Sequence, residues 1–168
     1  MVAKRARKPE PEVALQRRRF SADEYERMIE TGILRDDERL ELWEGDILCM
    51  SPVGKRHQAR VTWLNDHFAS ATHGRAIVWV QGSFRMHDGA EPQPDLLLLR
   101  YRDDFYESAL PEPADVLLLV EVADTSLVHD RDEKLPRYAA AGIIEVWIED
   151  LSGDRLLAYR EPRGGRYR

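Results

Sequence analysis

Two short runs of almost uninterrupted apolar residues constrain the fold of this chain more than any other feature. The first run is Leu96–Leu99, and the second is Val116–Val122, which contains a single carboxylate. Runs without polar alternation are typical of strands that are covered on both faces. Such a sheet needs other elements on each side, so the sequence predicts an α/β or α+β protein.

Segments around these two strands supply the other elements of such a fold. Ser21-Ala22-Asp23-Glu24 is a capping box, which predicts a helix over about 22–31. Apolar residues at helical spacing predict a second helix over 57–72, and Asp132 is expected to cap a third helix that runs to Ala141. Alternating residues and turn signals predict a hairpin and further strands at 39–50, 76–86, 143–148 and 156–159. This order predicts a central mixed sheet flanked by helices.

The chain has 168 residues, enough for one domain with a buried core and few for two. We expect a flexible basic arm at 1–19, a single domain at 20–160 and a C-terminal tail at 161–168. The single cysteine, Cys49, excludes an intrachain disulfide and a multi-cysteine zinc site, and it fits a reducing cytoplasm. No apolar run approaches the roughly 20 residues that span a bilayer, and no secretory signal is expected.

The net charge of -6 conceals an uneven distribution. Residues 1–19 hold seven basic and two acidic groups, whereas the remaining residues hold 18 basic and 29 acidic groups. A basic arm can contact nucleic-acid phosphates nonspecifically, although a solvated tail is the simpler interpretation. The acidic body argues against a large DNA-coating surface, but carboxylates grouped around a cation are consistent with it.

Carboxylates stand where hydrophobic residues would be expected in both buried strands. Asp95 opens the first run, and Glu121 interrupts the second. A buried carboxylate costs several kcal/mol unless it is paired or bound to a cation. Two such groups on neighbouring strands suggest a shared ion, and oxygen ligands without thiols favour Mg²⁺ or Mn²⁺. The alternative is that both carboxylates lie at strand ends, solvated or paired with arginines.

Two further residues support this interpretation. Lys134 is one of four lysines, and it lies near the start of the helix that follows the Glu121 strand. A lysine beside a metal-bound water can orient it and stabilise a pentacovalent phosphate, although most helix lysines face solvent. Glu41 faces opposite to its neighbours Leu40 and Leu42, so it is either a further ligand or an exposed glutamate paired with Arg39.

Pro94-Asp95, Glu121 and Lys134 resemble the active-site signature of the PD-(D/E)xK nuclease fold. More closely, the chain resembles the Uma-type putative restriction endonuclease family over about 20–160. The stretches that carry the resemblance are Arg39–Asp46, Ser51-Pro52 followed by His57, Gln81 before Pro94-Asp95, Leu119–Val122, Asp130–Gly142 and Glu145–Ile148.

The resemblance implies a restriction-endonuclease-like core and metal-dependent hydrolysis of phosphodiester bonds in nucleic acid, with DNA as the expected substrate. It also suggests a homodimer. By position it implies six site residues: the metal ligands Asp95 and Glu121, the catalytic lysine Lys134, the auxiliary acid Glu41, and Gln81 and His57 lining the site.

One position departs from the general signature of the fold. The lysine usually follows the glutamate by two residues on the same strand, and here that position is Ala123. The resemblance therefore implies that Lys134 supplies the amine from the next helix. Two other functions stay open: an inactive nuclease-fold module that binds nucleic acid or a protein, and an interaction protein whose acidic body binds a basic partner.

Overall fold

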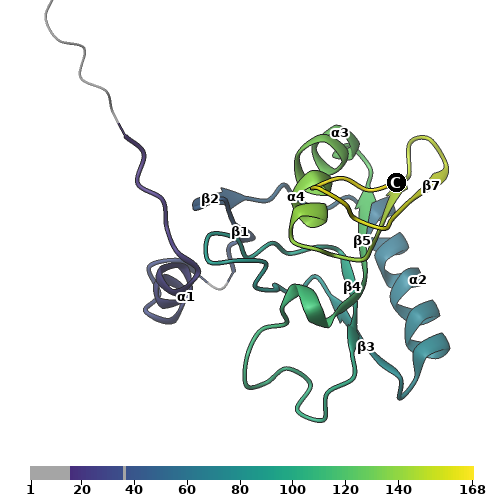
Figure 1. The fold of residues 1–168 in the computed structure, drawn as a ribbon, viewed down its shortest axis with the longest axis horizontal. Coiled ribbons are helices and arrows are strands. Elements are labelled where there is room, and N and C mark those ends of the chain that lie inside the picture. Colours follow the sequence, from purple (N-terminus) through teal and green to yellow (C-terminus); the bar gives the residue numbers. More distant parts are fainter. Residues whose placement is uncertain (1–15, 36) are drawn as a thin grey trace, which may run out of the picture.

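A five-stranded mixed sheet forms the centre of the protein in the computed structural model, which describes residues 16–35 and 37–168 (Figure 1). Most of the predicted basic arm lies outside the described residues. Only β5 and β6 pair in parallel, and the other neighbours pair antiparallel. The sheet confirms the predicted mixed α+β architecture. In their order across the sheet, its strands are β3 (Ala76–Val80), β4 (Leu96–Arg100), β5 (Val116–Ala123), β6 (Glu145–Asp150) and β7 (Arg155–Arg160).

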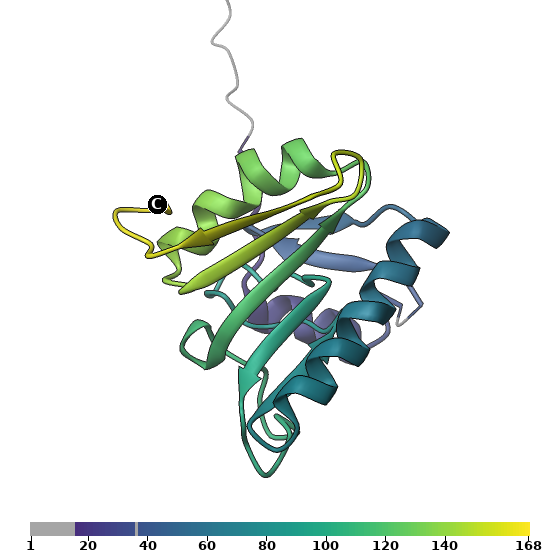
Figure 2. The same cartoon turned by 90° about the vertical axis from the view of Figure 1, so that its right-hand side faces the viewer.

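Different elements cover the two faces of this sheet. The long helix α2 (Lys55–Thr72) lies on one face, as Figures 1 and 2 show. The opposite side carries the antiparallel hairpin of β1 (Leu40–Trp43) and β2 (Asp46–Cys49), and the short helical segments that follow β5. Helix α1 (Ala22–Glu30) packs against the hairpin, and its predicted capping box is present. A short 3₁₀ turn, Pro113–Asp115, precedes β5.

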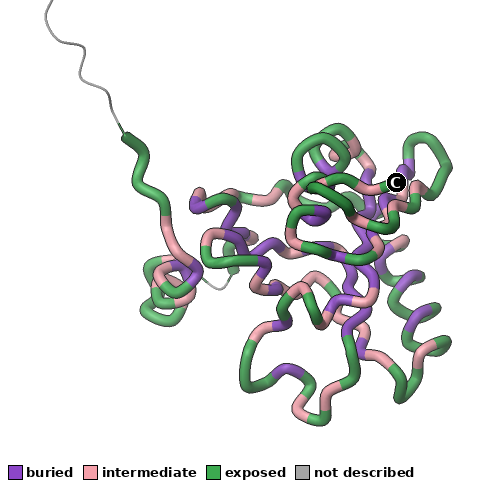
Figure 3. The backbone as a smooth tube through the Cα atoms, in the orientation of Figure 1, coloured by how far each residue is buried: buried purple, intermediate pink, exposed green. Residues whose placement is uncertain are grey.

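The apolar run of β4 is buried because its side chains alternate between two cores. Leu97 and Leu99 pack on the hairpin side, while Leu96 and Leu98 pack against α2. The buried backbone in Figure 3 accordingly follows the central strands. This arrangement explains why the sequence of β4 lacks polar alternation, as its two-sided burial requires.

The strand predicted over 76–86 ends early, at Val80. Gln81 has a positive φ of 48°, which turns the chain out of the sheet. At Gly82 an added Cβ would lie 2.0 Å from Nε1 of Trp79, so only glycine fits beneath this ring. The turn directs the side-chain amide of Gln81 toward Asp95, and this amide donates a hydrogen bond to Oδ1 of Asp95 at 3.3 Å.

The helix that was expected to begin at Asp132 begins earlier and is not uniform. Helix α3 (Leu127–His129) runs into a π-helical turn over Asp130–Lys134, and α4 (Leu135–Ala140) completes the segment. The turn closes with a bond from the Leu135 N–H to the Asp130 carbonyl, and Pro136 supplies no N–H at the next position. Asp132 is therefore exposed within the turn and is not a cap.

The end of the chain returns to the loop between α4 and β6. The hydroxyl of Tyr167 donates to the carbonyl of Ile143 at 2.7 Å, and its ring packs beside Tyr159. In the described part of the chain, no helix is both long and apolar enough to cross a membrane.

Helix α1 is tied to the body of the protein through Arg85. Its guanidinium contacts Asp23 at 2.8 Å and Glu26 at 2.9 Å on α1, and the buried Glu91 at 3.2 Å. Burial raises the pKa of Glu91 to about 7, and the nearby Glu26 adds to this effect, while Arg85 opposes it. Glu91 is 2% exposed, so its ionisation lowers the stability of the folded state.

We predict that Glu91 makes the protein less stable as the pH rises. Its folded-state pKa lies above its ordinary value, so its contribution to stability is complete below about pH 4.5 and is lost as the pH rises to about 7. The loss amounts to as much as about 3 kcal/mol. Urea unfolding between pH 5 and pH 8 measures it, and Glu91→Gln should flatten the profile while Glu30→Gln, an exposed control, should not. Equal pH dependence in all three proteins would contradict this account.

Candidate active site

A cleft of about 610 Å³ opens between the hairpin, the start of α2 and the segment that follows β5. Five of the six predicted site residues line it, and the sixth, Gln81, contacts Asp95 from outside the lining. The structure therefore brings together residues from six separate parts of the chain. The five lining residues are Glu41, His57, Asp95, Glu121 and Lys134.

Asp95 lies directly before β4, where the pairing of Leu96 with Val120 sets it beside β5. Its Oδ2 accepts hydrogen bonds from Nε2 of His57 at 3.0 Å and from the N–H of Val122 at 2.9 Å. Within residues 16–35 and 37–168, its Oδ1 accepts only the long bond from the side chain of Gln81. The hydrogen bond to Asp95 raises the pKa of His57, while burial opposes the rise. One oxygen of Asp95 is thus held by the protein.

Glu121 repeats this pattern on β5. Its Oε1 accepts the Tyr138 hydroxyl at 2.8 Å and Nζ of Lys134 at 3.2 Å, whereas its Oε2 has no hydrogen-bond donor among the described residues. The residue is only 4% exposed. Burial raises the pKa of Glu121, and the charge of Lys134 opposes the rise.

Lys134 lies among carboxylates at the floor of the cleft. Its Nζ is 3.2 Å from Glu121 and 3.7 Å from Oε2 of Glu41, which also accepts a long bond from the Gln93 N–H. Burial alone would lower the pKa of Lys134, but Glu121, Glu41 and Asp130 together raise it. The ammonium therefore stays charged, and Glu41 is buried beside it, not paired with Arg39.

Several residues of the cleft were not predicted from the sequence. Asp130 is buried and accepts a hydrogen bond from Ser126 at 2.6 Å, and its pKa is raised by burial against the charge of Lys134. The exposed His129 also lines the cleft, and Tyr138, which does not line it, donates to Glu121 from behind. The spacing of Asp130, Lys134 and Tyr138 at four-residue intervals was the signal that could have grouped them.

The donor atoms at the cleft floor fit a hard cation with few protein ligands. Among residues 16–35 and 37–168, no three His, Cys, Asp or Glu side chains already form a metal-binding cluster. Asp95 and Glu121 nevertheless supply two carboxylates. In each of them, one oxygen accepts short hydrogen bonds from the protein and the other does not. Mg²⁺ binds in this way, through one or two carboxylates together with water and substrate phosphate.

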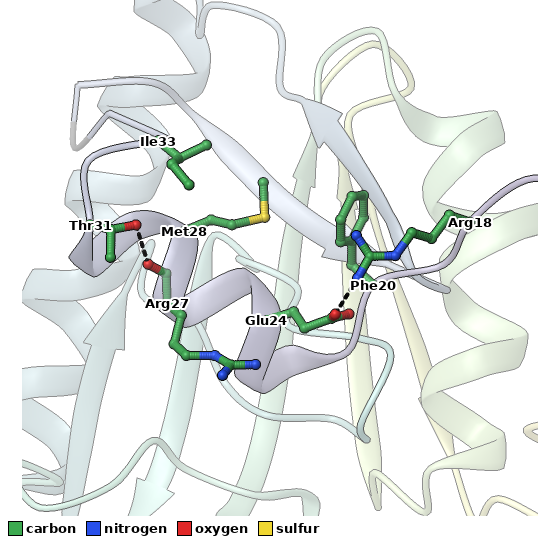
Figure 4. Close-up of a pocket in the computed structure, with 7 residues that line it drawn as sticks. All are labelled: Arg18, Phe20, Glu24, Arg27, Met28, Thr31 and Ile33. Atoms are coloured by element: carbon green, nitrogen blue, oxygen red, sulfur yellow. Dashed lines mark hydrogen bonds and ion pairs between the residues drawn. The ribbon is translucent and has the colours of Figure 1, made fainter.

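A second hollow, of about 300 Å³, lies over α1 (Figure 4). Arg18 pairs with Glu24 there, and the Thr31 hydroxyl donates to the carbonyl of Arg27. It contains a single carboxylate and none of the predicted site residues. Its lining consists of Arg18, Phe20, Glu24, Arg27, Met28, Thr31 and Ile33.

Comparisons with known proteins identify a family and a similar fold. A family model described as "Uma2: Putative restriction endonuclease" matches residues 22–168. Among solved structures, the fold is similar to that of a putative nuclease of the DUF820 group from Anabaena variabilis ATCC 29413. The two share 14% sequence identity with a TM-score of 0.63, over 86% of this chain and 80% of the other. A search of curated proteins gave no match.

We predict that loss of the Lys134 charge destabilises the fold. Lys134→Met leaves Glu121 and Glu41 buried without a cation, which costs about 3–5 kcal/mol at pH 8. Adding Glu121→Gln to this variant should recover part of the loss, because one uncompensated carboxylate is removed. Urea unfolding measures both effects.

Arg131→Met is the matched control on the same helical turn. Arg131 pairs with Asp132 at the surface, so its loss should cost at most about 1 kcal/mol. Similar losses for Lys134→Met and Arg131→Met would show that the Lys134 pair is not buried in solution.

Proposed function

The chain belongs to the Uma2 family of putative restriction endonucleases, and we propose that it is a divalent-metal-dependent endonuclease that hydrolyses phosphodiester bonds. The observation that carries this proposal is the charged Lys134 beside Glu121 and near Asp95 at the floor of a cleft. Glu121 is held in this position by a lysine and a tyrosine, and Asp95 by a histidine and a backbone amide.

Asp95 and Glu121 would hold the metal ion through the oxygens that the protein leaves without strong hydrogen bonds. A bound Mg²⁺ or Mn²⁺ supplies Lewis acidity toward a phosphate oxygen and lowers the pKa of a bound water. Asp95 directly precedes β4 and Glu121 lies on the neighbouring strand β5, so the sheet fixes the separation of the two carboxylates. His57 and Gln81 orient Asp95, and Tyr138 orients Glu121.

Lys134 would contribute a fixed positive charge to the reaction. Its ammonium has three protons, and it lies beside both Glu121 and Glu41, so one proton is available to an attacking water or to the phosphate. Placed in advance, this charge stabilises negative charge as it develops on the phosphate. Glu41, as an auxiliary acid, holds the other side of the ammonium.

Further parts of the proposal are more specific. The family suggests nucleic acid as the substrate, and we propose DNA. The oxygen donor set supports magnesium or manganese. Action in the cytoplasm, which fits the single cysteine, and assembly as a homodimer are also proposed, and size-exclusion chromatography with light scattering tests the latter.

Cleavage of supercoiled plasmid and of a labelled single strand, with Mg²⁺, Mn²⁺ or EDTA, tests the proposal. We expect metal-dependent cutting that falls at least about 100-fold in Glu121→Gln and in Lys134→Met. The exposed controls Glu30→Gln and Arg131→Met should cut like the unmodified protein.

Other outcomes of this assay separate the alternatives. Equal cutting by all variants would point to a contaminating nuclease or a different site. Binding of nucleic acid without cutting in any metal would favour the alternative that the chain is an inactive nuclease-fold module. The feature that favours this alternative is the position of Lys134, which lies on the helical segment after β5 and not two residues after Glu121.

We predict that Tyr138→Phe weakens the site without unfolding the protein. The substitution keeps the buried ring and removes only the hydroxyl that donates to Glu121. Residues that orient metal ligands typically change metal affinity or activity by about 10–100-fold. The Mn²⁺ concentration for half-maximal cutting should rise, and saturating Mn²⁺ should restore part of the rate. A rate loss that no Mn²⁺ concentration relieves would contradict a role through the metal site.

A further inference from the structure

Arg39 lies at the mouth of the cleft without a carboxylate partner in the described part of the chain. It directly precedes β1 and is two residues from Glu41, so both side chains extend to the same side of the strand. Both line the cleft. Its Nη1 donates only to the carbonyl of Ser51, at 2.9 Å. The remaining donors of this guanidinium are available to a ligand.

The wall of the cleft that follows Ser51 ends at the start of α2. This helix begins after Gly54 without a side-chain cap, and its first turn contains no acidic residue. It contains Lys55 and Arg56 instead, which are unfavourable at the positive end of a helix dipole. Such an end is a typical binding position for an anion, and the carboxylate of Asp124 lies beside it, 3.7 Å from where a Cβ of Gly54 would stand.

The first turn of α2 also contains a histidine nitrogen without a hydrogen-bond partner. His57 is 8% exposed and lines the cleft, and its Nδ1 is buried without a hydrogen bond. Arg56 donates to the carbonyl of Leu151, and its other contact is an ion pair of 3.9 Å with Asp124. Arg56 is thus already paired with a carboxylate, which leaves Arg39 as the lining arginine without one among the described residues.

The opposite wall has the opposite charge. The segment after β5 contributes Asp124 and Asp130 to the cleft lining, and no lysine or arginine before Lys134 on the floor. Arg39 on one wall therefore faces carboxylates on the other wall, an arrangement that suits the phosphates of one strand. A duplex that straddled the cleft would place its second row of phosphates against the acidic wall.

The depth of the floor and the apolar loop beside it favour a flexible strand. Glu121 and Lys134 are 4% and 7% exposed, so a phosphate must enter the cleft to reach them. Pro52 and Val53 are exposed on the wall from Ser51 to Gly54, with Val53 at 39%. Unpaired bases can cover apolar side chains with their faces, whereas the bases of a duplex are already stacked.

We infer that Arg39 binds a backbone phosphate of a single nucleic-acid strand that lies along the wall from Ser51 to Gly54. This inference rests on the proposed function, because it names the substrate that the cleft would take. The strand would pass the uncapped start of α2 and present one phosphate to the floor. Arg39 is the clearest test, because Gln at this position can still donate to Ser51 while it lacks the charge.

Fluorescence anisotropy in EDTA with a labelled 15-nucleotide single strand, and with the same sequence as a duplex, tests the inference without cleavage. The unmodified protein should bind the single strand at least about fivefold more tightly than the duplex. Arg39→Gln should raise the single-strand Kd about fivefold to tenfold and reduce the salt slope by about 0.7, as expected for one lost phosphate contact. Arg39→Lys, which keeps the charge, should recover most of the affinity.

Arg131→Gln, an exposed arginine away from the cleft lining, is the control and should leave the Kd unchanged. Duplex binding as tight as single-strand binding, or equal effects of Arg39→Gln and Arg131→Gln, would overturn the inference. Thermal unfolding of each variant separates lost binding from lost folding. If the protein cuts nucleic acid but Arg39→Gln leaves the Kd unchanged, the inference about Arg39 fails and the hydrolase proposal stands. If the protein binds the single strand as expected but cuts with no metal, only the hydrolase proposal fails.

Discussion

The ion pair between Lys134 and Glu121 is the interaction on which the rest of the site depends. A carboxylate on the central strand β5 and an ammonium on the next helical segment are both removed from water, so each requires the other. The pair ties the helical segment that follows β5 to the sheet that it covers. It also sets the charge at the floor of the cleft. Burial raises the pKa of Glu121 even with Lys134 beside it, so the ammonium offsets only part of the cost of ionising Glu121.

In each of the two candidate metal ligands, the protein holds one carboxylate oxygen by hydrogen bonds and leaves the other for a metal ion. Asp95 is held through Oδ2 by His57 and Val122, and Glu121 is held through Oε1 by Tyr138 and Lys134. Each carboxylate is therefore oriented before any ligand arrives, which reduces the reorganisation that binding requires. These orienting bonds come from α2, β5 and the segment from Asp130 to Tyr138, so the whole fold contributes to the placement of two oxygens.

The sequence predicted the parts of the site that break a pattern. Asp95 and Glu121 stood out because a carboxylate in an apolar strand is costly, and Lys134 stood out because lysine is rare in this chain. Tyr138 was missed because an aromatic residue on an apolar helix face resembles an ordinary core residue. The π-helical turn was missed because a single turn of this kind leaves the spacing of apolar residues nearly helical. The early end of the strand at Val80 depends on the ring of Trp79 over Gly82, which is a tertiary contact.

The central claim is that Asp95 and Glu121 together hold one divalent ion beside Lys134. Anomalous diffraction from crystals soaked in Mn²⁺ tests it directly, because the signal locates the ion without reference to activity. The account predicts an anomalous peak between the two carboxylates, in contact with Asp95 Oδ1 and Glu121 Oε2, and no peak there in Glu121→Gln crystals. A peak elsewhere in the cleft, or none at saturating Mn²⁺, would contradict it.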